Sequence, residues 1–354
     1  MNRRRFAAAA ATLVAASALP RAASAQAAVR GEVVDDAGRK VRVPARAARI
    51  FASGPPASIL VFAVAPDALI GWTTPFRPAE RPYVAPKYAD LPALGRLTGR
   101  GNTANVEVVI AAKPDVIVDY GAINDTYVSL ADRVQQQTGI PYLLLDGAFD
   151  RISASLRTIG ALAGDEARGE DLATYARATV DDVTQRVARV PAAKRPRLYY
   201  ARGPRGLDTG LAGSINMEVI DRMGATNVAA SMGRGGLVQV SLEQVLAWNP
   251  EVIVTTDPTW FASVRRDPLW RPIAAVASGR VHLAPAEPFG WIDFPPSINR
   301  LVGLRWLGRI LYPDAFPEDL RPVVREFYTR CYHQAPTEAQ LATLIATAER
   351  TPPA

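Results

Sequence analysis

Two stretches of the chain, 136 residues apart, carry nearly the same pattern of residues. The first reads NVEVVIAAKPDVIVDYG (105–121) and the second reads SLEQVLAWNPEVIVTTD (241–257). Each has a glutamate at its third position, a proline near its middle and a Val-Ile-Val run soon after. The residue before a proline is pushed out of the helical region, so each stretch predicts a short helix that stops at the proline and a buried strand that follows. A chain that contains this unit twice is expected to fold as two similar lobes.

The rest of the chain follows the same alternation of short apolar strands and helices. A hairpin is expected first, within GEVVDDAGRKVRVP (31–44). Further strands are expected at 49–54, 68–74, 115–121, 140–147, 197–203, 252–258 and 281–287. Strands that alternate with helices indicate parallel βαβ units. The expected fold class is therefore α/β, with two similar lobes, each a mainly parallel sheet flanked by helices.

The segment between the two halves, 165–190, shows no strand pattern. Its apolar residues recur at roughly helical spacing from Leu172 to Val187, which predicts one helix of about 24 residues, about 36 Å long. Its position favours a connector over an ordinary surface helix. The expected domains are an N-terminal lobe at 26–160, a long linking helix at 161–194 and a C-terminal lobe with a helical tail at 195–354.

Residues 1–25 have the features of an export signal. Three arginines, Arg3 to Arg5, precede a short apolar run, and Ala23-Ser24-Ala25 offers a cleavage site. The run is shorter than the roughly 20 residues that span a bilayer, so a membrane anchor is the less favoured alternative. The sequence Arg-Arg-x-Phe also fits a twin-arginine signal. We therefore expect a periplasmic protein that is cleaved near Ala25.

The net charge bears on the possible partners of the protein, and the cysteine content bears on what stabilises its fold. The formal net charge of +7 falls to about +3 when the four arginines of residues 1–25 are set aside, which does not argue for a nucleic-acid partner. Cys331 is the one cysteine, so an internal disulfide cannot form and stability must come from buried cores.

Signals of enzymatic chemistry are missing from the sequence. It has no G-x-S-x-G, P-loop or CxxC motif, and its two histidines, His282 and His333, fall in a predicted strand and in the tail. No His, Cys or Asp cluster has metal-ligand spacing. We expect no enzymatic activity, no cofactor and no metal bound by the protein itself.

The doubled motif, the two lobes, the linking helix and the signal together resemble the substrate-binding proteins of ABC importers for ferric siderophores, cobalamin and haem. The resemblance covers essentially the whole chain after the signal. It implies a monomer that captures a small molecule and delivers it to a permease dimer with its ATPase. It also implies that the linking helix is a stiff hinge, so that closure of the lobes is small.

The resemblance further implies that Glu107 and Glu243 project from the two lobes and contact arginines of the two permease subunits. Two carboxylates held apart on a rigid body could orient the protein on a two-fold partner. Each glutamate alone also fits an ordinary acid in the first turn of a helix, where it complements the helix dipole.

The ligand is expected beyond the carboxyl ends of the parallel strands, where loops rich in aromatic residues and arginine lie. Candidate ligand-binding residues are Trp72, Arg77, Tyr83, Tyr120, Arg202, Arg205, Arg234, Trp260, Trp291 and Asp293. Asp293 fits a ligand contact and a turn residue equally well. Aromatic faces with guanidinium groups suit a bulky anionic ligand that has flat parts.

A ferric siderophore fits that description, so an iron complex is the expected ligand. An oxyanion such as molybdate is an alternative, because the turn SGPPAS (53–58) opens a helix whose free N–H groups could bind an anion. Haem is another alternative, for which Tyr83 or Tyr120 could supply an axial ligand. Cobalamin is less favoured, since it needs a cleft with less positive charge.

Overall fold

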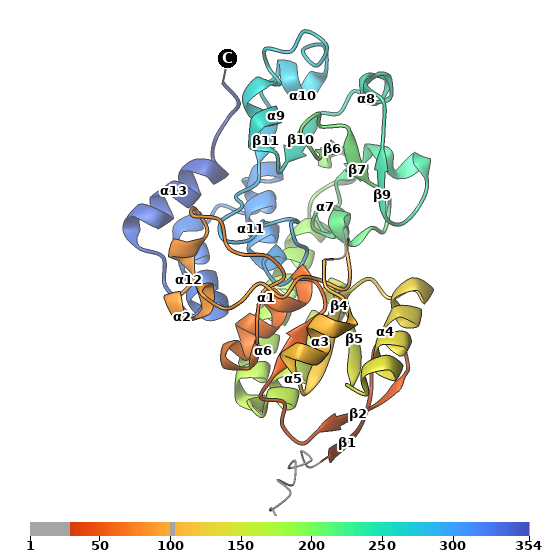
Figure 1. Ribbon diagram of the computed structural model, residues 1–354. Helices are drawn as coiled ribbons and strands as arrows, with labels where there is room; N and C mark the ends of the chain where they lie inside the picture. The colour runs from red at the N-terminus through yellow and green to blue at the C-terminus, as the bar shows by residue number, and fades with distance from the viewer. Residues whose placement is uncertain (1–28, 100–102, 354) are drawn as a thin grey trace, which may run out of the picture.

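Two parallel sheets form the centres of two lobes in the computed structural model, which describes residues 29–99 and 103–353 (Figure 1). The N-terminal sheet has the order β3-β4-β5, with strands β3 (Ile50–Ala52), β4 (Val116–Gly121) and β5 (Tyr142–Asp146). The C-terminal sheet has the order β11-β10-β6-β8, with strands β6 (Arg197–Ala201), β8 (Thr226–Asn227), β10 (Val252–Thr255) and β11 (Val281–Leu283). The expected α/β class with two similar lobes is confirmed.

Helices flank both sheets (Figure 1). The N-terminal half contains α1 (Pro55–Val64), α2 (Pro86–Ala89), α3 (Val106–Ala112), α4 (Asp125–Thr138) and α5 (Phe149–Ala163). The C-terminal half contains α7 (Glu218–Arg222), α8 (Leu242–Trp248), α9 (Pro258–Ser263), α10 (Ala274–Ala277), α11 (Arg300–Leu311), α12 (Leu320–Tyr332) and α13 (Glu338–Ala348). Two antiparallel pairs complete the fold: β1 (Val29–Val34) with β2 (Lys40–Pro44), and β7 (Asp208–Gly210) with β9 (Leu237–Gln239).

The duplicated stretch forms the same unit in each lobe, α3 with β4 and α8 with β10. The side chains of Asn105 and Ser241 cap the helix starts, each by accepting a backbone N–H three residues later. Lys113 and Asn249 end the helices in the left-handed conformation, with φ of 47° and 43°, directly before the prolines. The predicted sequence of helix, stop and buried strand is therefore confirmed twice.

The segment 68–74 does not form the expected strand. It makes only isolated bridges, such as Ile50 with Leu69 and Trp72 with Ala93. Its start, Pro66–Ala68, is a 3-10 turn, and the segment then bonds first to Ile50 and next to the chain at 92–94, so no single partner forms a ladder with it.

The linking helix α6 runs from Glu166 to Ala188 and packs against α5 and α11. Its contact with α5 is close, because a Cβ atom at Gly160 would lie 2.8 Å from Cα of Gly169. Asp165 caps its start by accepting the N–H of Arg168 at 3.1 Å. No helix among residues 29–99 and 103–353 is long and apolar enough to cross a membrane. The expected signal, residues 1–25, lies outside the described residues.

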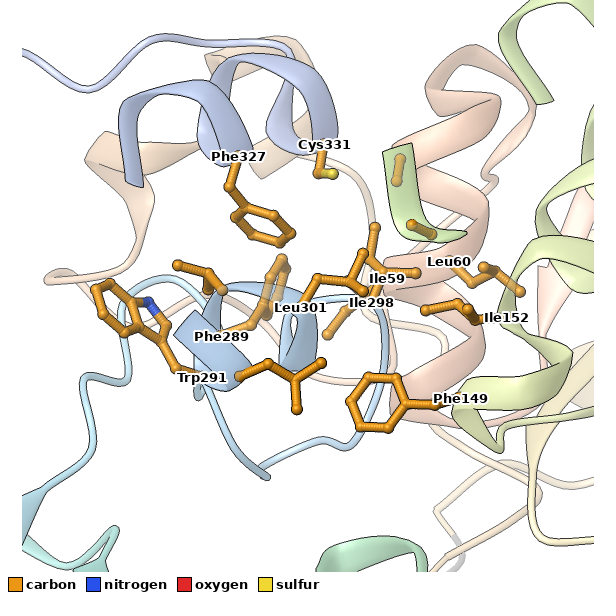
Figure 2. Close-up of a cluster of buried hydrophobic side chains, with 14 of the residues drawn as sticks. Ile59, Leu60, Phe149, Ile152, Phe289, Trp291, Ile298, Leu301, Phe327 and Cys331 are labelled. Atoms are coloured by element: carbon orange, nitrogen blue, oxygen red, sulfur yellow. The ribbon is translucent and has the colours of Figure 1, made fainter. Parts of the chain in front are cut away.

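The helical tail packs against both lobes, with α13 on β11 and α12 also on α11. Helix α12 packs against α1 of the N-terminal lobe, and His333, just after it, lies 2.8 Å from the carbonyl of Phe62 through Nε2. Figure 2 shows Phe327 and Cys331 of α12 above a cluster that includes Ile59 of α1 and Leu301 of α11. The tail therefore covers the apolar face of α1 and extends one core across both lobes.

Candidate functional site

A cavity of about 420 Å³ lies between the lobes, at the carboxyl ends of the strands. The N-terminal lobe contributes Asp119 and Tyr120 from β4, and the C-terminal lobe contributes Arg202, directly after β6. This is where ligands bind in open α/β sheets. Both lobes therefore present chain from strand ends to the same space.

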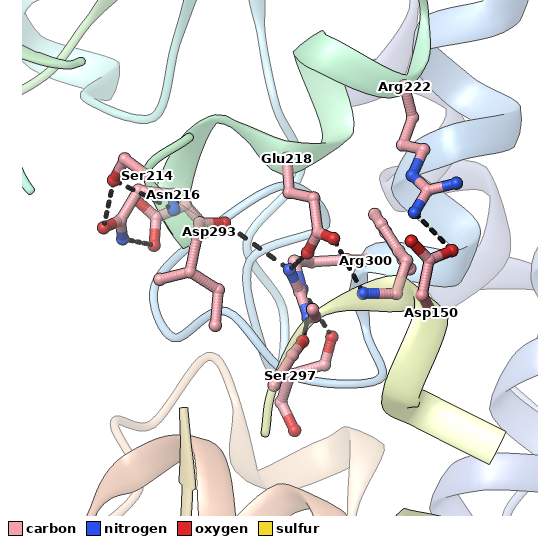
Figure 3. Close-up of polar contacts among 12 residues, drawn as sticks. Asp150, Ser214, Asn216, Glu218, Arg222, Asp293, Ser297 and Arg300 are labelled. Atoms are coloured by element: carbon pink, nitrogen blue, oxygen red, sulfur yellow. Dashed lines mark hydrogen bonds and ion pairs between the residues drawn. The ribbon is translucent and has the colours of Figure 1, made fainter. Parts of the chain in front are cut away.

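Arg202 and Asp293 form a buried ion pair in the cavity wall. Their side chains are 8% and 1% exposed, and Nη2 of Arg202 lies 2.9 Å from the Asp293 carboxylate. Asp293 also accepts hydrogen bonds from Asn216 Nδ2 at 2.7 Å, from the Tyr200 hydroxyl at 3.1 Å and from the N–H of Phe294 at 2.8 Å. In Figure 3, Asp293 lies beside Asn216 and Ser214. So many donors hold the Asp293 side chain in one orientation.

Burial and neighbouring charge shift the pKa of Arg202 in opposite directions. Burial is the largest single effect and favours the neutral form, but the charge of Asp293 and the contacts with Tyr200 together outweigh it and raise the pKa of Arg202. Burial, followed by the charge of Asp293, raises the pKa of Tyr200, so its hydroxyl remains a donor. The Nε atom of Arg202 is buried and has no hydrogen-bond partner within the described residues. The guanidinium is thus a fixed cation with one unsatisfied donor.

The wall from the N-terminal lobe contains a buried carboxyl group, Asp119. Burial raises the pKa of Asp119, although hydrogen bonds from Ser53 and Thr98 oppose the shift. Oγ1 of Thr98 lies 3.2 Å from the carboxyl group, and the N–H of Tyr120 lies 2.9 Å from it. A buried, hydrogen-bonded carboxyl group with a raised pKa therefore forms part of this wall.

Tyr120 lines the cavity, but its hydroxyl is directed to the carbonyl of Gly147 at 3.4 Å. Burial raises the pKa of Tyr120 to about 12. To serve as an axial ligand to haem iron, Tyr120 would have to break this hydrogen bond and lose its proton. Tyr83, the other tyrosine considered for that role, packs against Tyr328 with 6% exposure.

Apolar groups form most of the remaining wall. They are Pro55, Pro56, Ile215, Leu237, Phe294, Pro295 and Pro296. Pro55 and Pro56 are the first two residues of α1, so the two donors that a helix start would offer there are missing. The start of α1 therefore lines the cavity, but it offers an anion fewer free N–H groups than a helix start without proline.

Four of the aromatic candidates lie in cores and do not line the 420 Å³ cavity: Trp72, Tyr83, Trp260 and Trp291. Trp72 Nε1 donates to the carbonyl of Tyr88 at 2.7 Å, and Trp291 Nε1 donates to the Tyr328 hydroxyl at 3.1 Å. Trp260 packs against Trp270 with 4.9 Å between ring centroids. Their position after strand ends suggested the cleft, but burial of such large rings stabilises the fold more.

Three arginine candidates, Arg77, Arg205 and Arg234, are exposed and also lie outside the cavity wall. Arg77 pairs with Glu80 at 2.6 Å, where the hydrogen bond to this carboxylate raises the pKa of Arg77. Of the ten candidates, the cavity brings together Tyr120, Arg202 and Asp293.

Sequence reasoning missed several wall residues: Arg96, Thr98, Asp119, Asn216 and Phe294. One signal was available for Asp119, since a charged residue inside the buried strand VIVDYG calls for a reason. Asn216 had no such signal, because its contact with Asp293 joins residues 77 positions apart.

Glu107 and Glu243 are exposed in the first turns of α3 and α8, on separate lobes (Figure 1). A hydrogen bond to its own backbone and one from Ser241 lower the pKa of Glu243. Neither glutamate has a salt-bridge partner within the described residues. No group of three His, Cys, Asp or Glu residues in that part of the chain could hold a metal ion.

A ligand-sized cavity between two lobes, with a long helix joining them, defines a two-lobed binding protein. Residues 80–288 match the family described as periplasmic binding protein, and the chain belongs to this family. It is 30% identical over 256 residues to the molybdate-binding protein MolA of Haemophilus influenzae, which covers 67% of this chain and 72% of MolA.

Two solved structures are similar over most of the chain. An ABC transporter solute-binding protein from Sulfurospirillum deleyianum has a TM-score of 0.80 at 29% identity and covers 88% of this chain and 98% of its own. MolA of H. influenzae, bound to molybdate, has a TM-score of 0.71 at 26% identity and covers 86% of this chain and 99% of its own. The chain is thus a periplasmic binding protein for an ABC transporter and not an enzyme. Its family implies export, and its role implies a permease and an ATPase as partners.

Proposed function

We propose that the protein captures a bulky anionic metal chelate, of the ferric-siderophore class, and delivers it to an ABC importer. The observation that carries the proposal is the cavity of about 420 Å³, mainly apolar, whose wall holds Arg202 as a fixed cation. Sites for drug-sized molecules typically measure about 300–1,000 Å³. A compact oxyanion would leave most of this space and its apolar wall unused.

Arg202 would bind acidic oxygens of the ligand. A guanidinium presents donors in a planar fork that fits carboxylate or catecholate oxygens, and Asp293 occupies only part of this fork. A ligand oxygen near Nε would supply the partner that this buried donor lacks. Because Asp293 balances Arg202, an anionic ligand gains from a second cation, and the half-buried Arg96 lines the same cavity.

Molybdate is the second candidate, favoured by the similarity to MolA. The two prolines at the start of α1 remove donors that a small oxyanion would use. The hydrogen-bonded, high-pKa Tyr120 and the buried Tyr83 make haem a weaker candidate.

The remaining parts of the proposal concern export and delivery. Residues 1–25 would direct export, through the twin-arginine form, with cleavage near Ala25. The mature monomer would need no cofactor. Glu107 and Glu243 would contact cationic residues of the two permease subunits, one from each lobe.

Calorimetric titration of the mature protein tests the ligand class. The panel holds ferric siderophores of catecholate, hydroxamate and carboxylate type, together with molybdate, haemin and cobalamin. Tight binding of a ferric chelate, with much weaker binding of its iron-free form, is expected. Binding of molybdate alone would overturn the siderophore proposal and leave the role of binding protein intact.

A further inference from the structure

A second, smaller cavity of about 150 Å³ lies beside the main one. The two cavities share three wall residues, Pro55, Phe294 and Pro295. A space of about 150 Å³ lined by apolar side chains is large enough to admit a benzene ring. This side pocket therefore offers room for one ring beyond the space that surrounds Arg202.

Aromatic rings form one face of the side pocket. The ring of Trp72 lies 4.8 Å from that of Phe76 and 5.8 Å from that of Phe289, measured between centroids, and the rings of Phe76 and Phe289 are also 5.8 Å apart. All three line the pocket. Aromatic rings prefer edge-to-face or offset contacts at these separations, so a fourth ring could pack among them.

Polar groups form another part of the wall. Thr73, Thr74 and the carboxylate of Glu80 line the same pocket. Glu80 is held in place by Arg77, whose Nε and N–H lie 2.7 Å from its two oxygens. A carboxylate keeps spare lone pairs after two such bonds and can accept a further hydrogen bond. A hydroxyl group on the edge of a bound ring would supply that hydrogen bond, provided that its oxygen does not coordinate the metal.

Phe294 separates the side pocket from Arg202. The centre of its ring lies 4.3 Å from the Arg202 guanidinium carbon, and the residue is 53% exposed. Its φ of 60° lies in the left-handed region, which is costly for a bulky side chain. The fold thus holds an exposed ring at the boundary between the two cavities, in contact with the cation.

We infer that the side pocket binds an aromatic ring of the ligand that carries a hydroxyl group not bound to the metal, of the phenol type, while an anionic part of the same ligand lies against Arg202. Phe294 contacts both parts. The inference rests on the proposed capture of a bulky anionic chelate, and it adds that the chelator carries an aromatic ring.

Two substitutions at Thr74 test the inference. Thr74 is exposed and lines the pocket, so Thr74→Phe should fill the space without disturbing the core, and Thr74→Ser leaves the space open. The probes are the ferric complexes of 4-hydroxybenzohydroxamate and of acetohydroxamate, which chelate iron through the same group, and molybdate. Dissociation constants come from calorimetry. Thr74→Phe should raise the dissociation constant of the aromatic complex at least about tenfold, because the complex then loses the burial of a phenyl-sized group. Thr74→Ser should leave this dissociation constant unchanged.

A second measurement avoids reliance on one variant. In the gallium complex of 4-hydroxybenzohydroxamate, NMR contacts are expected between ligand ring protons and the rings of Trp72 or Phe289. Aromatic binding that Thr74→Phe does not weaken, or that shows no such contacts, would overturn the side-pocket inference and leave the proposed function standing. Binding of molybdate alone, or of the aliphatic complex in preference to the aromatic one, would also overturn it. Only the molybdate result would remove the proposed function as well.

Discussion

Arg300 and Glu218 form an ion pair of 2.7 Å behind the cavity, and the same two side chains hold the N-terminal lobe (Figure 3). Arg300 donates to the carbonyl of Gly147, and Glu218 accepts the N–H of Phe149 at 2.7 Å. The Gly147 carbonyl also accepts from Tyr120, which lines the cavity. One ion pair, with a fully buried arginine, therefore joins α7 and α11 of one lobe to the start of α5 in the other.

Replacing one member of this pair should be strongly destabilising. Arg300 is fully buried, so Arg300→Met leaves Glu218 without its cation and should cost about 3–5 kcal/mol of unfolding free energy. Urea denaturation followed by circular dichroism measures the change. Arg325→Met serves as the control, because the Arg325–Glu338 pair is exposed and should contribute less than about 1 kcal/mol. Equal losses of unfolding free energy in the two variants would show that the Arg300–Glu218 pair contributes no more than an exposed pair.

Arg202 should matter for affinity, and Arg205 should not. Arg202→Gln removes the cation from the cavity and is expected to weaken an anionic ligand about 10- to 100-fold, the usual value of a charge-assisted hydrogen bond. Arg205→Gln makes the same chemical change at an exposed residue outside the cavity. Calorimetric titration of both variants with the ligand identified by the panel compares them. A similar loss in both would show that the cavity does not bind the ligand through Arg202.

Reversing the charges of Glu107 and Glu243 should separate delivery from capture. The double change Glu107→Lys with Glu243→Lys is expected to abolish ATP-driven uptake in proteoliposomes that contain the permease and ATPase. Ligand affinity should stay within about twofold, because both residues are exposed and lie outside the cavity.

The control for that experiment is Asp181→Lys with Glu349→Lys, which changes the net charge equally at two other exposed acids. Uptake that falls as much in the control would point to overall charge and not to a docking surface. A loss of ligand affinity in the Glu107/Glu243 variant would contradict the separation of roles.

His282 should make stability depend on pH. Burial lowers the pKa of His282 from 6.5 to about 4, so the folded protein holds the neutral ring while the unfolded chain takes up a proton first. The contribution of neutral His282 to the free energy of unfolding is therefore fully present above pH 6.5, and it is lost as the pH drops from 6.5 towards 4. His282→Leu should flatten this part of the stability profile, which urea titrations at several pH values record. An unchanged slope in the variant would assign the pH dependence to other groups.

Much of the fold could be predicted from signals that act between residues close together in the sequence. Proline stops, Asn or Ser caps and β-branched runs act within a few residues, so both copies of the duplicated unit and the linking helix could be predicted from sequence. The same reasoning failed at 68–74, because a strand needs a partner, and this segment forms only isolated bridges with Ile50 and Ala93.

The candidate site was less predictable. The rule on strand ends placed the cavity correctly and selected Arg202, which directly follows β6. It could not distinguish rings that face the cavity from rings that pack in a core. That difference depends on partners far along the chain, such as Tyr328 for Trp291 at a separation of 37 residues.

The sequence by itself determined the α/β class, the duplication, the connector and the two glutamates in equivalent helix starts. Each of these depends on periodicity or on neighbours within one helix or turn. Only the tertiary structure decided that the tail covers α1, that Arg202 and not Arg77, Arg205 or Arg234 enters the cavity, and that Phe294 separates two pockets. These features depend on long-range packing, where burial of an aromatic ring or pairing of a charge is settled by surfaces that the local sequence does not encode.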